Sequence, residues 1–376
     1  MTHRSWLIAL CLLGTLALMS CTSQSSDIVI GEYGSLTGGD ATFGTSTRNG
    51  VDMALDEVNK AGGVLGKKVR VIVEDDQSLP EQARTVITKL ISKDRVVAVI
   101  GEVATSRSQA AGPVAQQNSI PMISPSSTGV KVTQIGDYIF RVCFIDPFQG
   151  LVMAKFATNT LKVKNVAVLR DVKNDYSVGL ADVFVEEFKK MGGSIVADQS
   201  YGAGDIDFSA QLTSIKSKNP QAIFVPGYYT EVGLIARQVK KLGLNTVLMG
   251  GDGWDSPSLI GIGGDALNGS YFSNHYSVDD PSPAIQKFVS EYKARFKESP
   301  DGLAALGYDA AHILVEAMRR ANSTEGPKLR DAIAQTADYP GVTGKITIDK
   351  NRNSVKPAVV LQVKDGKLAY VETITP

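Results

Sequence analysis

A single acidic residue, Asp252, lies among glycines in the segment LMGGDGWDS, directly after a short apolar run. A carboxylate at such a place has three uses: it forms a turn with its own backbone, it acts as an acid or base in catalysis, or it contacts a ligand. Asp-Gly is itself a common turn pair, so the rest of the sequence must decide between these uses.

Neutral hydrogen-bond donors gather in two loops of the first half of the chain. They are the hydroxyl residues Thr105, Ser106, Ser126, Ser127 and Thr128. Helix starts follow these loops, and the free backbone N–H groups and the helix dipole there suit a carboxylate without a counter-ion. Taken singly, such residues are more often simple N-caps of helices.

Aromatic residues accompany Asp252 in the second half of the chain. They are Tyr176, Tyr228, Tyr229 and Trp254. An acid with aromatic neighbours suits an ammonium group, through charge-assisted hydrogen bonds and cation–π contacts, although the same aromatic residues could belong to the core. A ligand with a carboxylate at one end and an ammonium group at the other is an amino acid, and the joint placement of these loops favours that ligand.

The elements that must position these residues alternate between strands and helices. From residue 27 onward, short β-rich runs such as DIVIGEYG alternate with helical segments such as TRNGVDMALDEVNKAGG, which is typical of a parallel sheet with crossover helices. The same order recurs from residue 163, so that Phe43 corresponds to Tyr176, GEVATS to PGYYTE and SPSST to GGDGW. The sequence therefore predicts an internal duplication, with one open α/β sheet in each half.

Ligands of open parallel sheets bind beyond the carboxyl ends of the strands. The loops at those ends lie at residues 35–44, 101–106, 124–128, 171–176, 227–231 and 250–255. A proline interrupts the pattern near residues 144–150, where we expect the boundary between the halves. Helical segments that follow residue 275 are expected to complete the first lobe, so the chain must cross between the lobes more than once. Which sheet the final strands join stays open.

Length and composition allow two folded domains. The chain has 376 residues, and its 43% hydrophobic content can fill two cores. Its 39 lysines and arginines balance 39 aspartates and glutamates, so no overall charge attracts nucleic acid or an anionic membrane. A small, neutral partner is expected instead.

The N-terminal segment has the features of an export signal. Residues 1–20 run from Arg4 into an apolar stretch that is too short for a transmembrane anchor but typical of a signal peptide. The segment LMSC resembles the lipobox of bacterial lipoproteins, which makes Cys21 the lipid-modified N-terminus and residues 21–26 a polar tether. We therefore expect a lipid-anchored protein of the cell envelope, in the periplasm or on the outer face of the membrane.

Catalytic chemistry is not indicated by the sequence. Cys143 lacks a disulfide partner once the signal is removed, and its apolar surroundings predict a buried, inert thiol. Neither His275 nor His312 accompanies a nucleophile motif. The segment GIGGDA, residues 261–266, matches a dinucleotide pattern but follows no strand and opens no clear helix. We expect a binding protein without enzymatic activity, metal or cofactor.

The motifs GSLTGGDATFG, AGGVLGKKVRVIVEDD, IPMISPSST, LMGGDGW and VTGKITID occur in this order. Together they resemble the branched-chain (Leu/Ile/Val) amino acid binding proteins, which are type 1 periplasmic substrate-binding proteins of ABC importers. The resemblance implies an α/β fold of two Rossmann-like lobes with mainly parallel sheets, joined by a three-strand hinge. Lobe 1 is expected to comprise residues 27–144 and about 275–360, and lobe 2 residues 145–274 and about 361–376.

The resemblance also implies what the site residues and partners are. The expected contacts of the α-carboxylate are Thr105, Ser106, Ser126 and Thr128. The expected aromatic walls are Phe43, Tyr176 and Tyr228, and Asp252 is expected to take the α-ammonium group. Ser127 and Trp254, which lie in the same loops, are also expected to contact the ligand. The partners implied are an amino acid and the membrane permease of an ABC transporter, with no nucleic acid, and the protein is expected to be a monomer.

The chain departs from the pattern of the best-known members in three ways. Asp252 replaces a glutamate that is one methylene longer, Phe43 replaces a tyrosine, and Ser78 and Ala104 occupy the positions of a disulfide. The first two differences bear on which ligand binds. Amides, urea or aromatic acids are the alternative ligands of the same fold, and ligand sensing is the alternative role.

Overall fold

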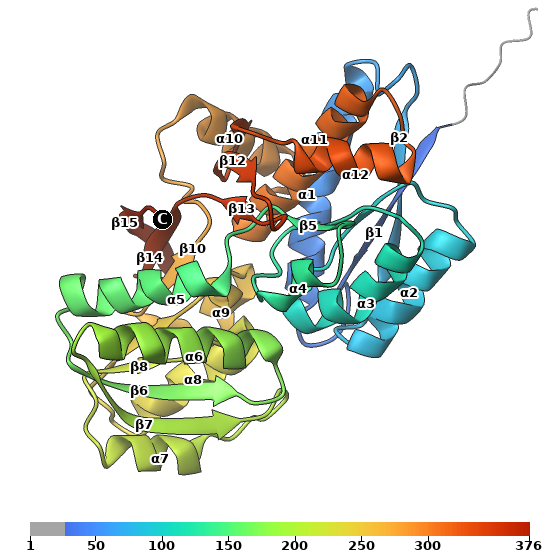
Figure 1. Ribbon diagram of the computed structural model, residues 1–376. Coiled ribbons are helices and arrows are strands. Elements are labelled where there is room, and N and C mark those ends of the chain that lie inside the picture. Colours follow the sequence, from blue (N-terminus) through green and yellow to red (C-terminus); the bar gives the residue numbers. More distant parts are fainter. Residues whose placement is uncertain (1–26) are drawn as a thin grey trace, which may run out of the picture.

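The computed structural model describes residues 27–376 and shows two lobes, each built around one sheet (Figure 1). Blue and teal segments form most of lobe 1, and green and yellow segments form most of lobe 2. The predicted fold class, two α/β lobes with mainly parallel sheets, is confirmed. The predicted signal peptide (1–20), the tether (21–26) and the lipidation site Cys21 lie outside the described residues.

Lobe 1 contains a five-stranded parallel sheet in the order β2-β1-β3-β4-β5. Its strands are β1 (Ile28–Gly34), β2 (Val69–Asp75), β3 (Val99–Ile100), β4 (Met122–Ser124) and β5 (Ile139–Arg141). The helices between them are α1 (Ala41–Lys60), α2 (Pro80–Ser92), α3 (Thr105–Gln117) and α4 (Lys131–Gln134).

Helices cover both faces of this sheet. Successive side chains of a strand point to opposite faces, so Val99 packs in the cluster that contains Leu90 of α2, whereas its neighbour Ile100 packs in the cluster that contains Val51 of α1. The central strands β3 and β4 are buried on both faces, and their residues are apolar except for Ser124.

Lobe 2 repeats this topology in the order β7-β6-β8-β9-β10, which confirms the predicted duplication. Its strands are β6 (Asn165–Asp171), β7 (Ser194–Tyr201), β8 (Ala222–Phe224), β9 (Val247–Gly250) and β10 (Tyr271–Asn274). Its helical elements are α5 (Asp146–Lys155), η1 (Phe156–Thr160), α6 (Asp175–Lys190), α7 (Ser209–Lys216), α8 (Tyr229–Lys241), η2 (Asp252–Trp254), α9 (Pro257–Gly263) and η3 (Gly264–Leu267).

The last third of the chain contributes to both lobes. It contains α10 (Pro283–Phe296), α11 (Gly302–Ala321), α12 (Gly326–Ala334), β11 (Tyr339–Gly341), β12 (Gly344–Ile348), β13 (Ser354–Val355), β14 (Ala358–Lys364) and β15 (Lys367–Ile374). Helix α11 packs along α1 of lobe 1, and β11, β12 and β13 form a small separate sheet. Strand β14 pairs antiparallel with β10 and with β15, so the final hairpin extends the sheet of lobe 2.

Three crossings connect the lobes. The first crossing, residues 142–145, joins β5 to α5; the second, residues 275–282, joins β10 to α10; and the third, residues 356–357, joins β13 to β14. The third crossing thus reaches lobe 2 at Ala358, slightly before residue 361, where the change of lobe was expected. Within residues 27–376, no helix is long and apolar enough to span a membrane.

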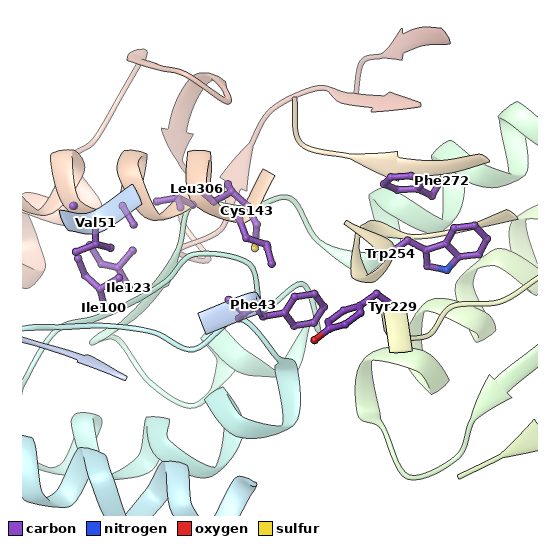
Figure 2. Close-up of a cluster of buried hydrophobic side chains, with 14 of the residues drawn as sticks. Phe43, Val51, Ile100, Ile123, Cys143, Tyr229, Trp254, Phe272 and Leu306 are labelled. Carbon is purple, nitrogen blue, oxygen red and sulfur yellow. The ribbon is translucent and has the colours of Figure 1, made fainter. Parts of the chain in front are cut away.

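One cluster of buried hydrophobic side chains continues from lobe 1 into lobe 2. Figure 2 shows Phe43 of α1 pointing toward Tyr229 of α8, and their ring centroids are 5.2 Å apart. Cys143, in the first crossing, is fully buried in the same cluster. Burial raises the pKa of its thiol to about 12, so Cys143 is the buried, protonated thiol that its surroundings predicted.

Candidate ligand-binding site

A small cavity lies between the lobes, where the loops after the strands of both sheets face each other. Its lining residues are Phe43, Val103, Thr105, Ser126, Thr128 and Leu303 from lobe 1 and Tyr176, Tyr228, Asp252 and Gly253 from lobe 2. The duplication explains this position, because the carboxyl ends of two similar sheets meet there.

The lobe 1 wall offers hydroxyl groups and a helix start. Thr105 is the first residue of the 13-residue helix α3, and its Oγ1 accepts a hydrogen bond from the backbone N–H of Gly129 at 3.1 Å. Ser126 and Thr128 follow β4. First-turn N–H groups have no partner inside their helix, and the N-terminus carries partial positive charge. This wall can therefore bind a carboxylate without a cationic side chain.

Aromatic rings form the side of the cavity. The rings of Tyr176 and Tyr228 are stacked, with centroids 5.4 Å apart, and Phe43 meets Tyr228 edge to face at 5.2 Å. The Tyr176 hydroxyl accepts a hydrogen bond from the backbone N–H of Gly253 at 3.1 Å, which links this ring to the turn that carries Asp252. The rings offer both apolar contact and π faces to a bound molecule.

Asp252 lies at the lobe 2 end of the cavity and is only 5% exposed. Gln149 Nε2 donates to Asp252 Oδ1 at 2.7 Å. Asp252 Oδ2 lies 3.0 Å from His275 Nε2 and accepts a 3.3 Å hydrogen bond from Ser126 Oγ of lobe 1. The carboxylate is therefore held by side chains of both lobes.

The partners of Asp252 are electrically neutral. Burial lowers the pKa of His275 to about 4, so its imidazole is neutral near pH 7 and donates from Nε2 to the carboxylate. Within residues 27–376, no lysine or arginine forms an ion pair with Asp252. A buried carboxylate without a cationic partner is costly, and a ligand with an ammonium group would supply that partner.

Three of the predicted residues lie away from the cavity. Ser106 is half-buried on α3 and does not line the cavity. Ser127 Oγ bonds within lobe 1, to the carbonyls of Glu102 at 2.9 Å and Val103 at 3.0 Å. Trp254 lies in the core of lobe 2 beside Phe272 (Figure 2). Its indole N–H donates to the Val225 carbonyl at 2.9 Å.

Other residues of the site carried no signal of their own in the sequence. Val103 and Leu303 add apolar surface to the lobe 1 wall, and Gln149 and His275 hold Asp252. Gln149 lies in the segment FIDPFQG, for which the sequence predicted only the boundary between the two halves. His275 has no nucleophile motif beside it in the sequence, and 23 residues separate it from its partner Asp252.

The rims of the two lobes touch in this structure. Thr42 Oγ1 and Ser256 Oγ are 2.9 Å apart, and Thr230 Oγ1 donates to the Gly39 carbonyl at 3.0 Å. Together with the contact between Ser126 and Asp252, these bonds close the cleft over the cavity. Within residues 27–376, no group of three or more His, Cys, Asp or Glu side chains is placed to hold a metal ion.

Comparison with known protein families supports what the fold indicates. The family model described as periplasmic binding protein matches residues 27–367. The chain belongs to the periplasmic binding protein family. Its relatives include proteins named for the binding of branched-chain amino acids.

Individual members of the periplasmic binding protein family match most of the chain. The Leu/Ile/Val-binding protein BraC3 of Rhizobium johnstonii is 32% identical over 86% of this chain and 87% of its own. The solved leucine binding protein LivK from Thermotoga maritima is 41% identical, with a TM-score of 0.90 over 93% of this chain and 99% of its own. LivJ from Streptococcus pneumoniae, solved in complex with isoleucine, is 34% identical, with a TM-score of 0.89 over 93% of this chain and all of its own.

Proposed function

We propose that this protein captures an amino acid with an aliphatic, branched side chain in the interlobe cavity and delivers it to the permease of an ABC importer. The observation that carries the proposal is Asp252, a buried carboxylate at the cavity whose hydrogen-bond partners are all neutral. The ammonium group of an amino acid provides the missing positive charge. Relatives named for leucine, isoleucine and valine support the same class of ligand.

The ligand has one orientation that satisfies both ends of the cavity. In that orientation its carboxylate meets the start of α3 with the hydroxyl groups of Thr105, Ser126 and Thr128, and its ammonium group meets Asp252. Its side chain then packs against the apolar and aromatic part of the wall. That part consists of Phe43, Val103, Tyr176, Tyr228 and Leu303.

Binding and closure are coupled because the two ends of the ligand contact different lobes. We take the moving bodies to be the two lobes that the crossings separate, residues 27–141 with 283–355 and residues 146–274 with 358–376, turning about the three crossings. A ligand that contacts both lobes stabilises the closed form more than the open form, and so shifts the hinge equilibrium. The closed monomer is the form that docks on the permease.

A lipid anchor at Cys21, after removal of residues 1–20, keeps the protein at the cell envelope with the tether 21–26 next to the lipid. Replacement of Cys21 by serine is expected to release the protein into the soluble fraction. Continued retention in the membrane fraction would refute lipidation at Cys21, without bearing on the ligand.

A thermal-shift panel tests the ligand class directly. It should contain the twenty amino acids, small amides, urea and aromatic acids, each at equal concentration. A ligand at 100 times its Kd stabilises the folded state by about 2.7 kcal/mol, so branched-chain amino acids should raise the melting temperature by several degrees. A shift with amides, urea or aromatic acids but with no amino acid would refute the proposal.

A further inference from the structure

Besides Ser126 of lobe 1, two side chains at or next to the crossings hold Asp252. Gln149 lies in the first turns of α5, directly after the first crossing, and His275 is the first residue of the second crossing. Their nitrogens lie 2.7 and 3.0 Å from Oδ1 and Oδ2 of Asp252. The His275 ring also stacks on Phe144 of the first crossing, with centroids 3.9 Å apart and an interplanar angle of 23°. The two crossings are therefore packed together behind the carboxylate.

The orientation of the Gln149 amide follows from its surroundings. Gln149 is fully buried, and its Nε2 faces the negatively charged Asp252 Oδ1. A flipped amide would place Oε1 against the carboxylate, and two acceptors repel each other. Oε1 itself has no hydrogen-bond partner among the described residues, so the bond to Asp252 is the polar contact that orients this side chain.

His275 is held in the neutral form by more than burial. Lys356 of the third crossing is buried nearby, and its positive charge also opposes a proton on the imidazole. The neutral ring donates from Nε2 to Asp252 and leaves Nδ1 without a hydrogen-bond partner among the described residues. Neither His275 nor Gln149 therefore cancels the charge of Asp252.

We infer that Gln149 and His275 are positioning residues that determine ligand specificity: they hold Asp252 in one orientation while leaving its charge for the ligand to neutralise. The site then accepts an acid that carries an ammonium group and rejects the same skeleton without one, because the latter leaves a buried charge unpaired. This inference rests on the proposed function, in which an amino acid binds in the cavity.

Calorimetric titration with leucine and with 4-methylpentanoate, the same skeleton without the ammonium group, tests the inference. Gln149→Met and His275→Phe each replace a donor by an apolar side chain of similar size, and Phe can still stack on Phe144. Each should weaken leucine binding about 10-fold, the order expected for losing one hydrogen bond to a charged group, and should reduce the preference for leucine over 4-methylpentanoate.

Two further variants separate positioning from general structural support. His275→Gln restores a neutral N–H donor and should bring leucine affinity back to within about threefold of the wild type, as expected if the donor rather than the ring matters. Gln149→Lys supplies an internal cation to Asp252. It should weaken leucine binding by about 100-fold or more and abolish the preference over 4-methylpentanoate.

The chain offers matched controls outside the cavity. Gln116 donates to Asp137 at 2.8 Å on the surface of lobe 1, and His312 of α11 lies 3.5 Å from Glu57. Gln116→Met and His312→Phe should change neither affinity nor preference. Melting curves identify variants that do not fold, and if His275→Phe is one of them, Gln149→Met and His275→Gln decide the result.

The outcomes distinguish the inference from the proposed function. If the folded Gln149→Met and His275→Phe variants bind leucine with unchanged affinity and preference, the inference is overturned. The proposed function still stands in that case, provided that the wild-type protein binds leucine. An equal loss in His275→Phe and His275→Gln would also overturn it, because the restored donor would then have no effect. If the wild type binds no amino acid at all, the proposed function falls and the inference falls with it.

Discussion

Replacement of Asp252 by asparagine removes one charge from the cavity and almost nothing else. The two side chains have the same shape, and an asparagine oxygen can still accept the hydrogen bond that Gln149 Nε2 now donates at 2.7 Å. Its amide nitrogen can donate to His275, whose neutral ring can present an unprotonated nitrogen in the other tautomer. The local packing should therefore survive.

The expected loss of affinity follows from the burial of this carboxylate. Asp252 is 5% exposed, so the ammonium group of the ligand would make a charge-assisted hydrogen bond there with little competition from water. Such bonds contribute about 1.5 to 3 kcal/mol, which corresponds to an increase in Kd of about 10- to 150-fold. The unliganded variant should melt at the same temperature as the wild type or higher, because an unpaired buried charge has been removed.

Isothermal titration calorimetry with leucine at pH 7 and melting curves without ligand provide the two measurements. Asp171→Asn is the matched control, because Asp171 is buried in lobe 2 but accepts from the backbone N–H groups of Lys173 and Ala203, at 2.9 and 3.0 Å, outside the cavity lining. A Kd for Asp252→Asn within about twofold of the wild type would refute the reasoning, since twofold is far below the effect of a charged hydrogen bond. An equal loss in both variants would refute it as well.

Other parts of the structure lead to three further predictions. Leu303→Ala shortens an apolar side chain of the cavity wall. If leucine loses contact with about two methylenes, at about 0.8 kcal/mol each, its affinity should fall about 10-fold while that of alanine changes little, so equal losses in titrations of both would contradict this placement. Burial raises the pKa of Glu32 to about 8, and burial together with the charge of Asp255 raises the pKa of Asp301 to about 7, so near neutral pH the native state holds protons that the unfolded state has lost. Urea titrations should therefore show that the free energy of unfolding falls as the pH rises from 6.5 to 8, and that it falls less steeply in Glu32→Gln. Cys143 should resist thiol reagents in the native protein and react on unfolding, because its thiol is buried and has a pKa of about 12; rapid labelling of the native protein would show that the first crossing opens to solvent.

Much of the site could be predicted because its loops occupy equivalent places in two copies of one topology. Thr105, Ser126 and Thr128 follow strands of the first sheet, Tyr176, Tyr228 and Asp252 follow strands of the second, and all six line the cavity. Periodicity and loop position reveal such residues, since the carboxyl ends of parallel strands share one edge of the sheet.

Loop position alone does not tell where each side chain points. Ser127 lies between two residues that line the cavity, yet its hydroxyl bonds inward to backbone carbonyls of lobe 1. Trp254 lies two residues after Asp252, yet the short helical turn η2 directs its indole into the core of lobe 2. Whether a side chain points into the cavity or into the core of a lobe depends on the local backbone geometry and on the space available for packing. Neither is visible in residue type.

By itself, the sequence determined the alternation of strands and helices, the duplication and the loops that face the cleft, because these follow from local periodicity and from the burial of sheet faces. The tertiary structure alone decided which residues surround the carboxylate. Gln149 and His275 lie more than a hundred residues apart in sequence, and they meet at Asp252 because two crossings pack against each other through the stacked rings of Phe144 and His275. The tertiary structure likewise decided that the final hairpin joins the sheet of lobe 2, where β14 pairs with the open edge of β10. Strand pairing of this kind depends on which edge is free in the folded lobe.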